Sequence, residues 1–162
     1  MQRTAVLQFL DNNNIIYEII DHEPLFTIAQ LNDMENFPDK EKVGKNLFLR
    51  NYNGKQHYLV IVRSDKTVDL KDLRMQIGSS RLSFASEERL MKHLKIKKGS
   101  VTPLAVINDE TKSIPVIIDH DLENESKIGV HPNINTSTVW LSYEALIKAI
   151  KTHGNPIIHV TI

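Results

Sequence analysis

Apolar residues recur along the chain with two different spacings, and each spacing predicts one kind of element. Helical spacing places Val6, Leu7 and Leu10 on one face of a predicted helix over residues 2–12, which a run of three asparagines ends. Four more helices are predicted to begin after capping residues, namely Thr27, Asp69, Ser86 and Ser142. The third of these is expected to extend to Gly99.

Runs rich in β-branched and aromatic residues predict the strands. They cover residues 15–20, 81–85, 103–108, 114–119, 138–142 and 157–162. A hairpin is predicted over residues 46–62, because two apolar runs flank Asn53-Gly54, a pair that tolerates positive φ in a tight turn. Since helices and strands are mixed without a repeat or linker, residues 1–162 are predicted to form a single α+β domain.

Composition narrows the function classes. Lys+Arg and Asp+Glu both number 20, so no global field attracts a polyanion, and any nucleic-acid contact must come from a local patch. The chain has no cysteine, which excludes thiol nucleophiles, thiolate metal sites and disulfides. Neither a signal-peptide pattern nor an apolar run long enough to span a bilayer occurs, so a cytoplasmic protein without membrane contact is expected.

The stretch GKNLFLRN at residues 44–51 is the first candidate for chemistry. Gly44 would let a ligand or loop approach the backbone, and Lys45 and Asn46 add a cation beside a neutral donor and acceptor. An ordinary lysine at a strand edge, reaching into solvent, has the same local sequence. Because strand neighbours point to opposite faces, Lys45 and Asn46 would share a site only if the strand began near Leu47.

Residues 129–132, with the sequence GVHP, are the second candidate. Gly129 would permit the chain to fold back, Pro132 would restrict φ, and His131 would supply a near-neutral polar group. Backbone N–H groups of such a loop could line a pocket. An ordinary turn has the same composition, so these residues alone leave both interpretations open.

Other familiar chemistry is absent or ambiguous. The seven histidines show no HxH or HxxxH pair, which leaves only a distant cluster such as His22, His120 and His131 for a metal, and none is expected. Asp119 and Asp121 could act as an acid–base pair or simply end a strand. The serine-hydrolase, phosphate-loop and dinucleotide motifs do not occur.

One basic segment, KHLKIKK at residues 92–98, could follow a phosphate backbone. The alternative is the solvated face of a helix. The residues expected to contact tRNA in the first case are Lys92, Lys95, Lys97 and Lys98.

Four stretches taken in order resemble one protein family. They are GKNLFLRN, RLSFASEERL, GSVTPLAVIND and GVHPNINTST. Through them the chain is similar, from about residue 15 to about residue 150, to the free-standing prolyl-tRNA editing proteins of the YbaK/ProX superfamily, and most similar to the PrdX, or ProXp-ala, branch. The resemblance implies a homologue of the prolyl-tRNA synthetase editing domain, with a mixed, mostly antiparallel sheet partly closed into a barrel and flanked by helices.

The resemblance also implies roles for the residues at matching positions. The expected catalytic residues are Lys45, Asn46 and His131. The residues expected to bind the substrate are Gly129, Val130 and Pro132 in the loop, with Ile20, Met34 and Phe37 in the pocket wall. No cofactor, metal or covalent protein nucleophile is implied, and either water or a ribose hydroxyl would attack the ester.

The leading interpretation is a trans-editing deacylase for alanine mischarged onto tRNA(Pro), with prolyl-tRNA synthetase as a possible further partner. One alternative is a deacylase for another small amino acid, because a pocket discriminates a methylene by only about 1–3 kcal/mol. A second is a non-catalytic module that binds tRNA or the synthetase. A third is an enzyme that forms a Schiff base through Lys45.

Overall fold

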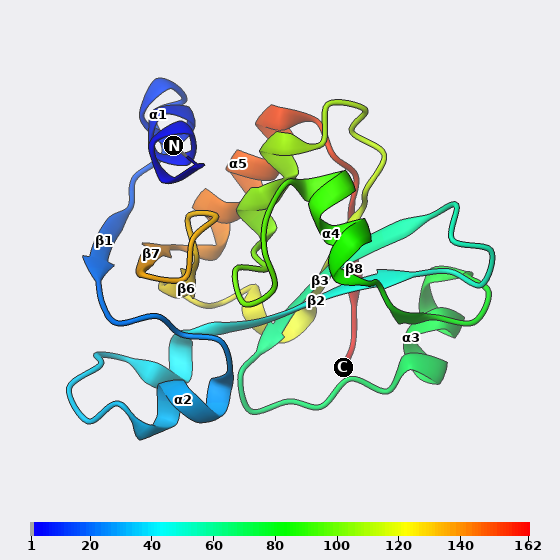
Figure 1. The fold of residues 1–162 in the computed structure, drawn as a ribbon, viewed down its shortest axis with the longest axis horizontal. Coiled ribbons are helices and arrows are strands. Elements are labelled where there is room, and N and C mark those ends of the chain that lie inside the picture. The colour runs from blue at the N-terminus through cyan, green and yellow to red at the C-terminus, as the bar shows by residue number, and fades with distance from the viewer. Residues whose placement is uncertain (1) are drawn as a thin grey trace.

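The computed structural model describes residues 2–162, in which two β-sheets are surrounded by helices (Figure 1). The five-stranded sheet has the order β4-β2-β3-β5-β8, with strands β2 (Gly44–Arg50), β3 (His57–Arg63), β4 (Ser83–Phe84), β5 (Val116–Asp119) and β8 (Ile157–Val160). The three-stranded sheet has the order β1-β7-β6, with strands β1 (Glu18–Asp21), β6 (Ile128–Val130) and β7 (Ser137–Leu141). Only the β3–β5 and β5–β8 pairs are parallel, so the predicted mixed, mostly antiparallel α+β domain is confirmed.

The helices begin where the capping residues predict. They are α1 (Gln2–Asn12), α2 (Ile28–Asp33), α3 (Leu70–Ile77), α4 (Glu87–Leu94) and α5 (Tyr143–His153), with short 3-10 helices at Lys40–Lys42, Pro103–Asn108 and His120–Leu122. The side chains of Thr27, Asp69, Ser86 and Ser142 each accept a hydrogen bond from a first-turn N–H group. None of the helices within residues 2–162 is both long enough and apolar enough to cross a membrane.

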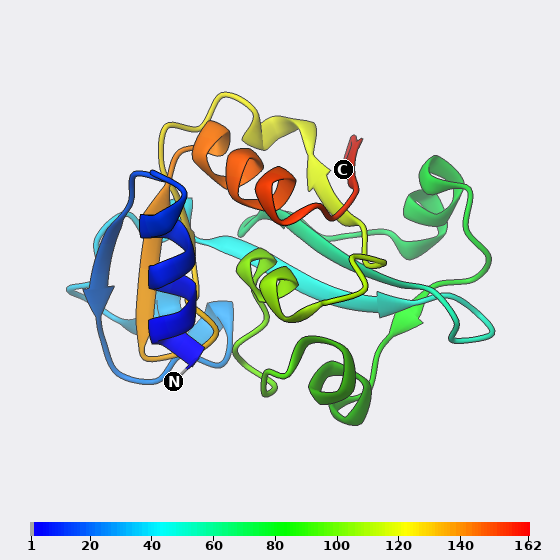
Figure 2. The same cartoon turned by 90° about the horizontal axis from the view of Figure 1, so that it is seen from above.

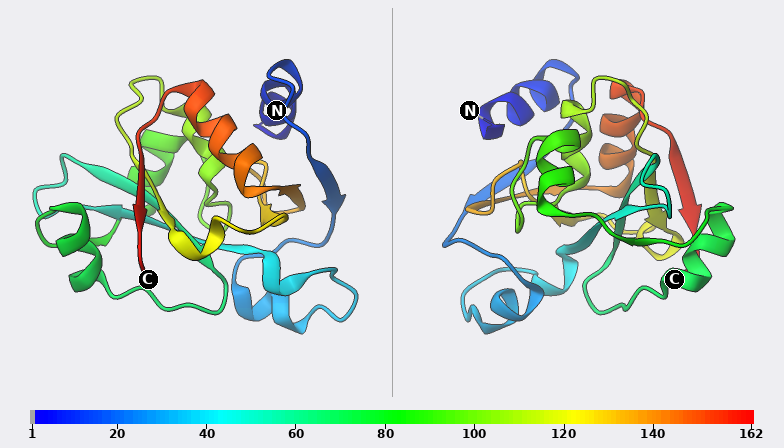
Figure 3. Two further views of the ribbon diagram at one scale, coloured as in Figure 1. Left: turned by 180° about the vertical axis from the view of Figure 1, so that it is seen from behind. Right: turned by 45° about the vertical axis from the view of Figure 1, so that its right-hand side comes forward.

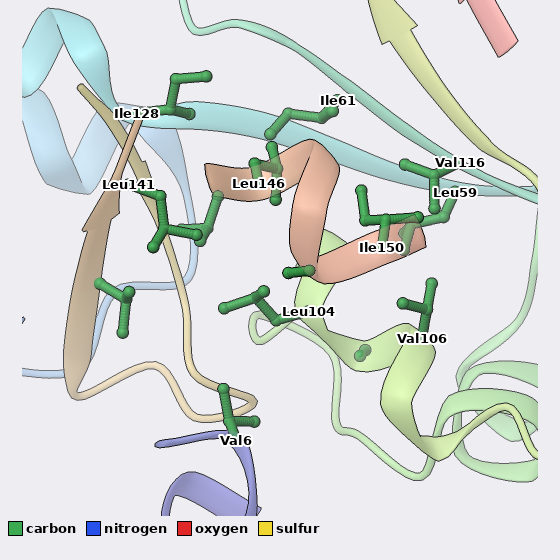
Figure 4. Close-up of a cluster of buried hydrophobic side chains, with 14 of the residues drawn as sticks. Val6, Leu59, Ile61, Leu104, Val106, Val116, Ile128, Leu141, Leu146 and Ile150 are labelled. Carbon is green, nitrogen blue, oxygen red and sulfur yellow. The ribbon is translucent and has the colours of Figure 1, made fainter. Parts of the chain in front are cut away.

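One apolar core connects the two sheets. Helix α5 and the segment Pro103–Asn108 cover one face of the five-stranded sheet, and α1 lies across the three-stranded sheet (Figure 2). Figure 4 shows Leu104, Leu146 and Ile150 packed between strand residues of both sheets. Fully burying each such side chain contributes roughly 1.5–3 kcal/mol, so the shared core holds both sheets in one domain.

A second apolar cluster covers the opposite face of the five-stranded sheet. It packs Leu73 of α3 against Leu49, Val60 and Ile117 of the strands. Helices α3 and α5 therefore lie on opposite sides of the β2–β3 ribbon, as the view from behind shows (Figure 3).

The strands expected over 15–20 and 81–85 are shorter, at Glu18–Asp21 and Ser83–Phe84, and two other predicted elements differ more. Residues 103–108, expected to be a strand, form a 3-10 helix because the Thr102 hydroxyl accepts from the Leu104 N–H at 3.3 Å and Pro103 occupies the first turn. The apolar run is buried in either conformation, so it could not distinguish them. Helix α4 ends at Leu94 rather than at Gly99, because Lys95 adopts φ 56° and breaks the helix.

The implied barrel closure is not found in the strand pairing of residues 2–162, which gives two separate sheets. An isolated parallel bridge between Val43 and Gly129 links them where β2 begins. Strand β6 occupies residues 128–130, where only a loop was expected. The bridge brings the GKN and GVHP motifs side by side, although they lie far apart in the sequence.

Candidate active site

A cavity of about 300 Å³ lies where the two sheets meet. This is the lower end of the range for small-molecule pockets and suits a small acyl group with part of a sugar. Four segments supply the lining: residues 25–28 with Leu31, residues 43–47, Gly99 with Val101, and residues 129–131 with Thr138.

Five of the residues that were expected to be catalytic or to bind the substrate line this one cavity, together with Gly44. They are Lys45, Asn46, Gly129, Val130 and His131. Pro132 is buried beside them, outside the lining found among residues 2–162. The tertiary structure therefore brings the two candidate motifs together at one site.

The apolar wall differs from the expected one. Ile20, Met34 and Phe37 are not among the lining residues within 2–162; they pack behind the wall, in a cluster with Leu25 and Leu31. Those two leucines line the cavity directly. Helix α2 turns Leu31 inward, and the capping-box pattern at Thr27 had predicted this helix but not which of its residues line the cavity.

The cavity opens along an edge of strand β2. That strand pairs with β3 along its whole length, but with β4 only at Leu49 and Arg50. At this edge the Ala85 N–H donates to the Phe48 carbonyl at 2.9 Å. Because backbone groups alternate direction along a strand, the N–H and C=O groups of Gly44 and Asn46 face the same edge as those of Phe48, away from β3.

Gly44 and Gly129 are needed for close approach of the backbone. A Cβ at Gly44 would lie 2.8 Å from Cδ1 of Ile61, and one at Gly129 would lie 2.7 Å from the Trp140 ring. Gly129 does not have positive φ, so it allows strand β6 to pack tightly and is not required for a fold-back. A side chain at Gly44 would displace Ile61 of β3, and one at Gly129 would displace Trp140 of β7, so each glycine keeps its strand packed against its own sheet.

Lys45 and Asn46 leave the strand on opposite faces, because β2 begins at Gly44 and not near Leu47. In register, Lys45 lies opposite Val62 and Asn46 lies opposite Ile61. Both residues still reach the cavity, since it opens along the strand edge. The expectation that they could share a site only if the strand began near Leu47 was therefore too strict.

The ammonium of Lys45 is held in place by backbone. Its Nζ donates to the carbonyl of Lys66 at 3.0 Å, in the segment that follows β3. An ammonium has three N–H donors, so two remain for a ligand.

The carbonyl that holds Lys45 belongs to a residue that is itself anchored. The Lys66 ammonium bonds Asp119 at 2.5 Å, Asp121, and the carbonyl of Ile162 at 2.8 Å. Burial lowers the pKa of Lys66, but the two carboxylates more than offset it, so the pKa lies above its ordinary value. Asp119 is only 1% exposed. The acid pair considered for general acid–base work instead holds a lysine.

Asn46 carries an unsatisfied acceptor. Its Nδ2 donates to the Gly44 carbonyl at 3.3 Å, whereas its Oδ1 is buried and has no hydrogen-bond partner among residues 2–162. A buried amide oxygen without a partner is costly, and an N–H group of a bound ligand would satisfy it.

His131 presents a neutral imidazole. Its Nδ1 lies 3.0 Å from the Ser137 carbonyl, which can only accept, so Nδ1 carries the proton and Nε2 is left as an acceptor. Burial lowers the pKa of His131, and the nearby His22 lowers it further, against the effect of the Ser137 hydrogen bond. The Thr102 hydroxyl donates to the His131 carbonyl at 2.6 Å and fixes the loop.

The histidines do not gather around a common point. His22 lies with its ring centroid 6.3 Å from that of His131, but His120 stacks on His159 and bonds Glu123 at 2.5 Å. Among residues 2–162, no three His, Asp or Glu side chains are placed to share a metal ion.

The basic segment leads to the rim of the cavity. Its lysines are all exposed, namely Lys92, Lys95, Lys97 and Lys98. The segment continues into Gly99, a lining residue that packs against the exposed ring of Phe26. Glu110 and Glu87 lie 3.8 Å from Lys95 and Lys98, long contacts between exposed groups that contribute little.

Known proteins share this chain's sequence and fold. The profile of the aminoacyl-tRNA editing domain family matches residues 22–149. The prolyl-tRNA editing protein ProX of Acetoanaerobium sticklandii is 48% identical over 155 residues, which cover 94% of this chain and 93% of that protein. The prolyl-tRNA synthetase associated domain-containing protein 1 of Bos taurus is 34% identical over 161 residues, covering 96% and 93%.

A solved structure has the same fold. The crystal structure of a candidate trans-editing enzyme for prolyl tRNA synthetase has a TM-score of 0.72 and 17% sequence identity, and the match covers 99% of this chain and 97% of that one. Together with the sequence matches, this confirms the resemblance carried by the four motifs. The chain belongs to the aminoacyl-tRNA editing domain family and is an aminoacyl-tRNA deacylase.

Proposed function

We propose that the cavity takes the alanyl ester at the 3′ end of mischarged tRNA(Pro) and hydrolyses it in trans, without a metal or a covalent protein nucleophile. The observation that carries the proposal is the convergence of Lys45, Asn46 and His131 on one small cavity. The prolyl-tRNA editing protein that is 48% identical to this chain supports the choice of tRNA(Pro).

Each polar group has a role that its contacts support. The unpaired Oδ1 of Asn46 accepts from the α-ammonium of the alanyl group. Lys45, with two free N–H donors, binds the terminal phosphate or the ester oxygen. The Asn46 N–H at the open edge of β2 donates to the carbonyl oxygen as negative charge develops.

Neutral His131 can move the proton. Its Nε2 accepts a proton from the attacking water as the oxygen bonds to the ester carbon. The bond between that carbon and the ribose oxygen then breaks, and the imidazolium returns the proton to the ribose. Alanine and the free tRNA hydroxyl are the products, so no group on the protein is consumed.

The amino acid accepted is decided by the wall formed by Leu25, Ile28 and Leu31. Alanine presents a single methyl group, which fits a cavity of about 300 Å³ together with part of the ribose. Another small amino acid differs by about a methylene, which is worth only about 1–3 kcal/mol in such a pocket.

The test is single-turnover deacylation of tRNA(Pro) charged in turn with alanine, serine, cysteine and proline. We expect alanine to be released fastest, proline to be spared, and EDTA to leave the rate unchanged. Faster release of another amino acid would reassign the substrate, and a loss in EDTA that zinc restores would exclude the metal-free mechanism. Binding without turnover would indicate a non-catalytic module, and borohydride trapping at Lys45 would indicate a Schiff base.

A further inference from the structure

A second group of cations lies at the far end of strand β2 from the cavity. Arg50 ends β2, Arg89 projects from α4, and Lys92 lies one helical turn further along. The hairpin that joins β2 and β3 is at the opposite end of the molecule from α2 (Figure 1). Strand β2 has 7 residues at about 3.3 Å each, so its two ends are about 20 Å apart.

The two guanidinium groups converge on one point. A Cβ at Gly54, in the hairpin loop, would lie 2.8 Å from Nη2 of Arg89 and 3.1 Å from Nη2 of Arg50. Arg89 donates to the Gly54 carbonyl at 3.0 Å, and Arg50 donates to the Tyr52 carbonyl at 3.0 Å. Backbone carbonyls of the loop thus hold both side chains in position.

No negative charge compensates this convergence. Arg50, Arg89 and Lys92 form no ion pair with a carboxylate anywhere in residues 2–162. Like charges held this close repel each other. An anion bound between them would attract both and offset that repulsion. Each guanidinium has five N–H donors, so both retain donors beyond those given to carbonyls.

The imidazoles beside the guanidinium groups sense the same positive field. His57 is buried, stacks on Phe48 and lies 3.3 Å from Nη1 of Arg89. Burial lowers its pKa to about 4, helped by His93 and by the charges of Arg89, Arg50 and Lys92. Asp109 acts in the other direction, and only on His93. The local field therefore favours an anion, and the histidines behind it are neutral at pH 7.

We propose that Arg50, Arg89 and Lys92 form a binding site for a backbone phosphate of the tRNA whose 3′ end occupies the cavity. This inference rests on the proposed function. Arginine pairs suit phosphate because their planar forks match its oxygens, and the site holds them preformed at an exposed loop. The exposed lysines of segment 92–98 lie between this site and the cavity rim, so one strand of RNA would meet cations along its whole path.

The test measures the binding of an uncharged tRNA(Pro) transcript by fluorescence anisotropy over a series of KCl concentrations. The salt slope is the magnitude of the slope of log affinity against log KCl concentration, and each lost phosphate contact lowers it by about 1. Lys92→Gln should show this with an unchanged melting temperature, because the Lys92 side chain makes no hydrogen bond or ion pair within residues 2–162. The double variant Arg50→Gln/Arg89→Gln should lower the slope by about 1–2.

Two controls separate charge from folding. Arg50→Lys/Arg89→Lys keeps both charges and should keep the slope, even if the hairpin loop loosens. Arg74→Gln removes an exposed arginine from α3, on the opposite face of the sheet, and should leave the salt slope and the melting temperature unchanged. Thermal melts of every variant identify any that fail to fold.

Unchanged slopes for Lys92→Gln and the double Gln variant would overturn the site. If the variants lose only binding of inorganic phosphate, followed by NMR, the cluster is a free-anion site and the RNA assignment is wrong. If the wild-type protein binds the transcript with the larger slope but hydrolyses no aminoacyl-tRNA, the proposed function fails and the phosphate site stands.

Discussion

Cations lie near both ends of strand β2, and their surroundings differ. Near the cavity, Lys66 is bonded to the carboxylates of Asp119 and Asp121, and its carbonyl holds Lys45. At the hairpin, the side chains of Arg50 and Arg89 hydrogen-bond only carbonyls and an imidazole within residues 2–162. A compensated cation serves as an anchor, whereas uncompensated cations held in place are ready to bind an anion. If the proposed sites hold, the surrounding charge, more than the residue type, distinguishes the structural cation from those that bind a ligand.

The first prediction concerns Lys45, the cation at the cavity end of strand β2. Lys45→Ala should slow the hydrolysis of Ala-tRNA(Pro) by roughly 10²–10³, the loss typical of one preorganised electrostatic group. The melting temperature should change little, because the ammonium makes one hydrogen bond, to a carbonyl. Single-turnover rates and melts measure both, with the exposed Lys71→Ala on α3, away from both cation sites, as a silent control. A variant that keeps more than about a third of the rate would show that Lys45 is only a surface residue.

The second prediction tests the anchor itself. Lys66→Met should lower the free energy of unfolding by about 3 kcal/mol, because it leaves the buried carboxylate of Asp119 without its cation. Adding Asp119→Asn should restore part of that loss, since the uncompensated charge is removed. Urea denaturation of the single and double variants measures the difference. Equal stability of the two would mean that Lys66 and Asp119 are not coupled.

The third prediction concerns His131, in the cavity, against His153, which lies at the end of α5. His131→Ala should reduce deacylation by about 10²-fold, the lower range for a group that transfers a proton, while His153→Ala should have no effect. Because burial lowers the pKa of His131, the wild-type rate should stay high near neutral pH and fall in acid as the imidazole becomes protonated. Equal rates for the two variants would contradict the assignment of the loop.

The fourth prediction concerns the pH dependence of stability that His57, beside the hairpin, should produce. His57 has a pKa of about 4 in the folded protein against about 6.5 when unfolded, so protonation favours the unfolded chain. The contribution of His57 to stability should be complete above about pH 7 and fall by about 3 kcal/mol as the pH drops to 4. His57→Gln should make this decline shallower in urea titrations. A bound phosphate should raise the pKa of His57, and NMR titration with and without tRNA would detect it.

The smallest expected effect concerns segment 92–98, which leads from the Arg50–Arg89 site to the cavity rim. Replacing Lys95 and Lys97 together with alanine should lower the salt slope of tRNA binding by no more than about 2 and leave the melting temperature unchanged. The comparison is with the Lys92→Gln variant in the same anisotropy series. Unchanged affinity at low salt would show that this part of the segment is a solvated helix end.

Local chemistry made much of this protein predictable. Thr27, Asp69, Ser86 and Ser142 cap helices through hydrogen bonds to neighbours in the chain, so their sequence signals sufficed. The Asn53-Gly54 hairpin was predictable for the same reason, since Gly54 adopts φ 70°. The segment 103–108 was not, because its apolar run is buried whether it forms a strand or a helix.

Candidate residues for the site could be named from the sequence, since Lys45, Asn46 and His131 carry motifs that resemble one family. What the tertiary structure decided is how they meet and what surrounds them. Gly44 and Gly129 leave room for Ile61 and Trp140 beside the cavity, and Leu25 and Leu31 line it because α2 packs there. Contacts such as those that bring Arg50 and Arg89 together at Gly54 join residues far apart in the chain, whereas a sequence pattern describes only neighbouring residues.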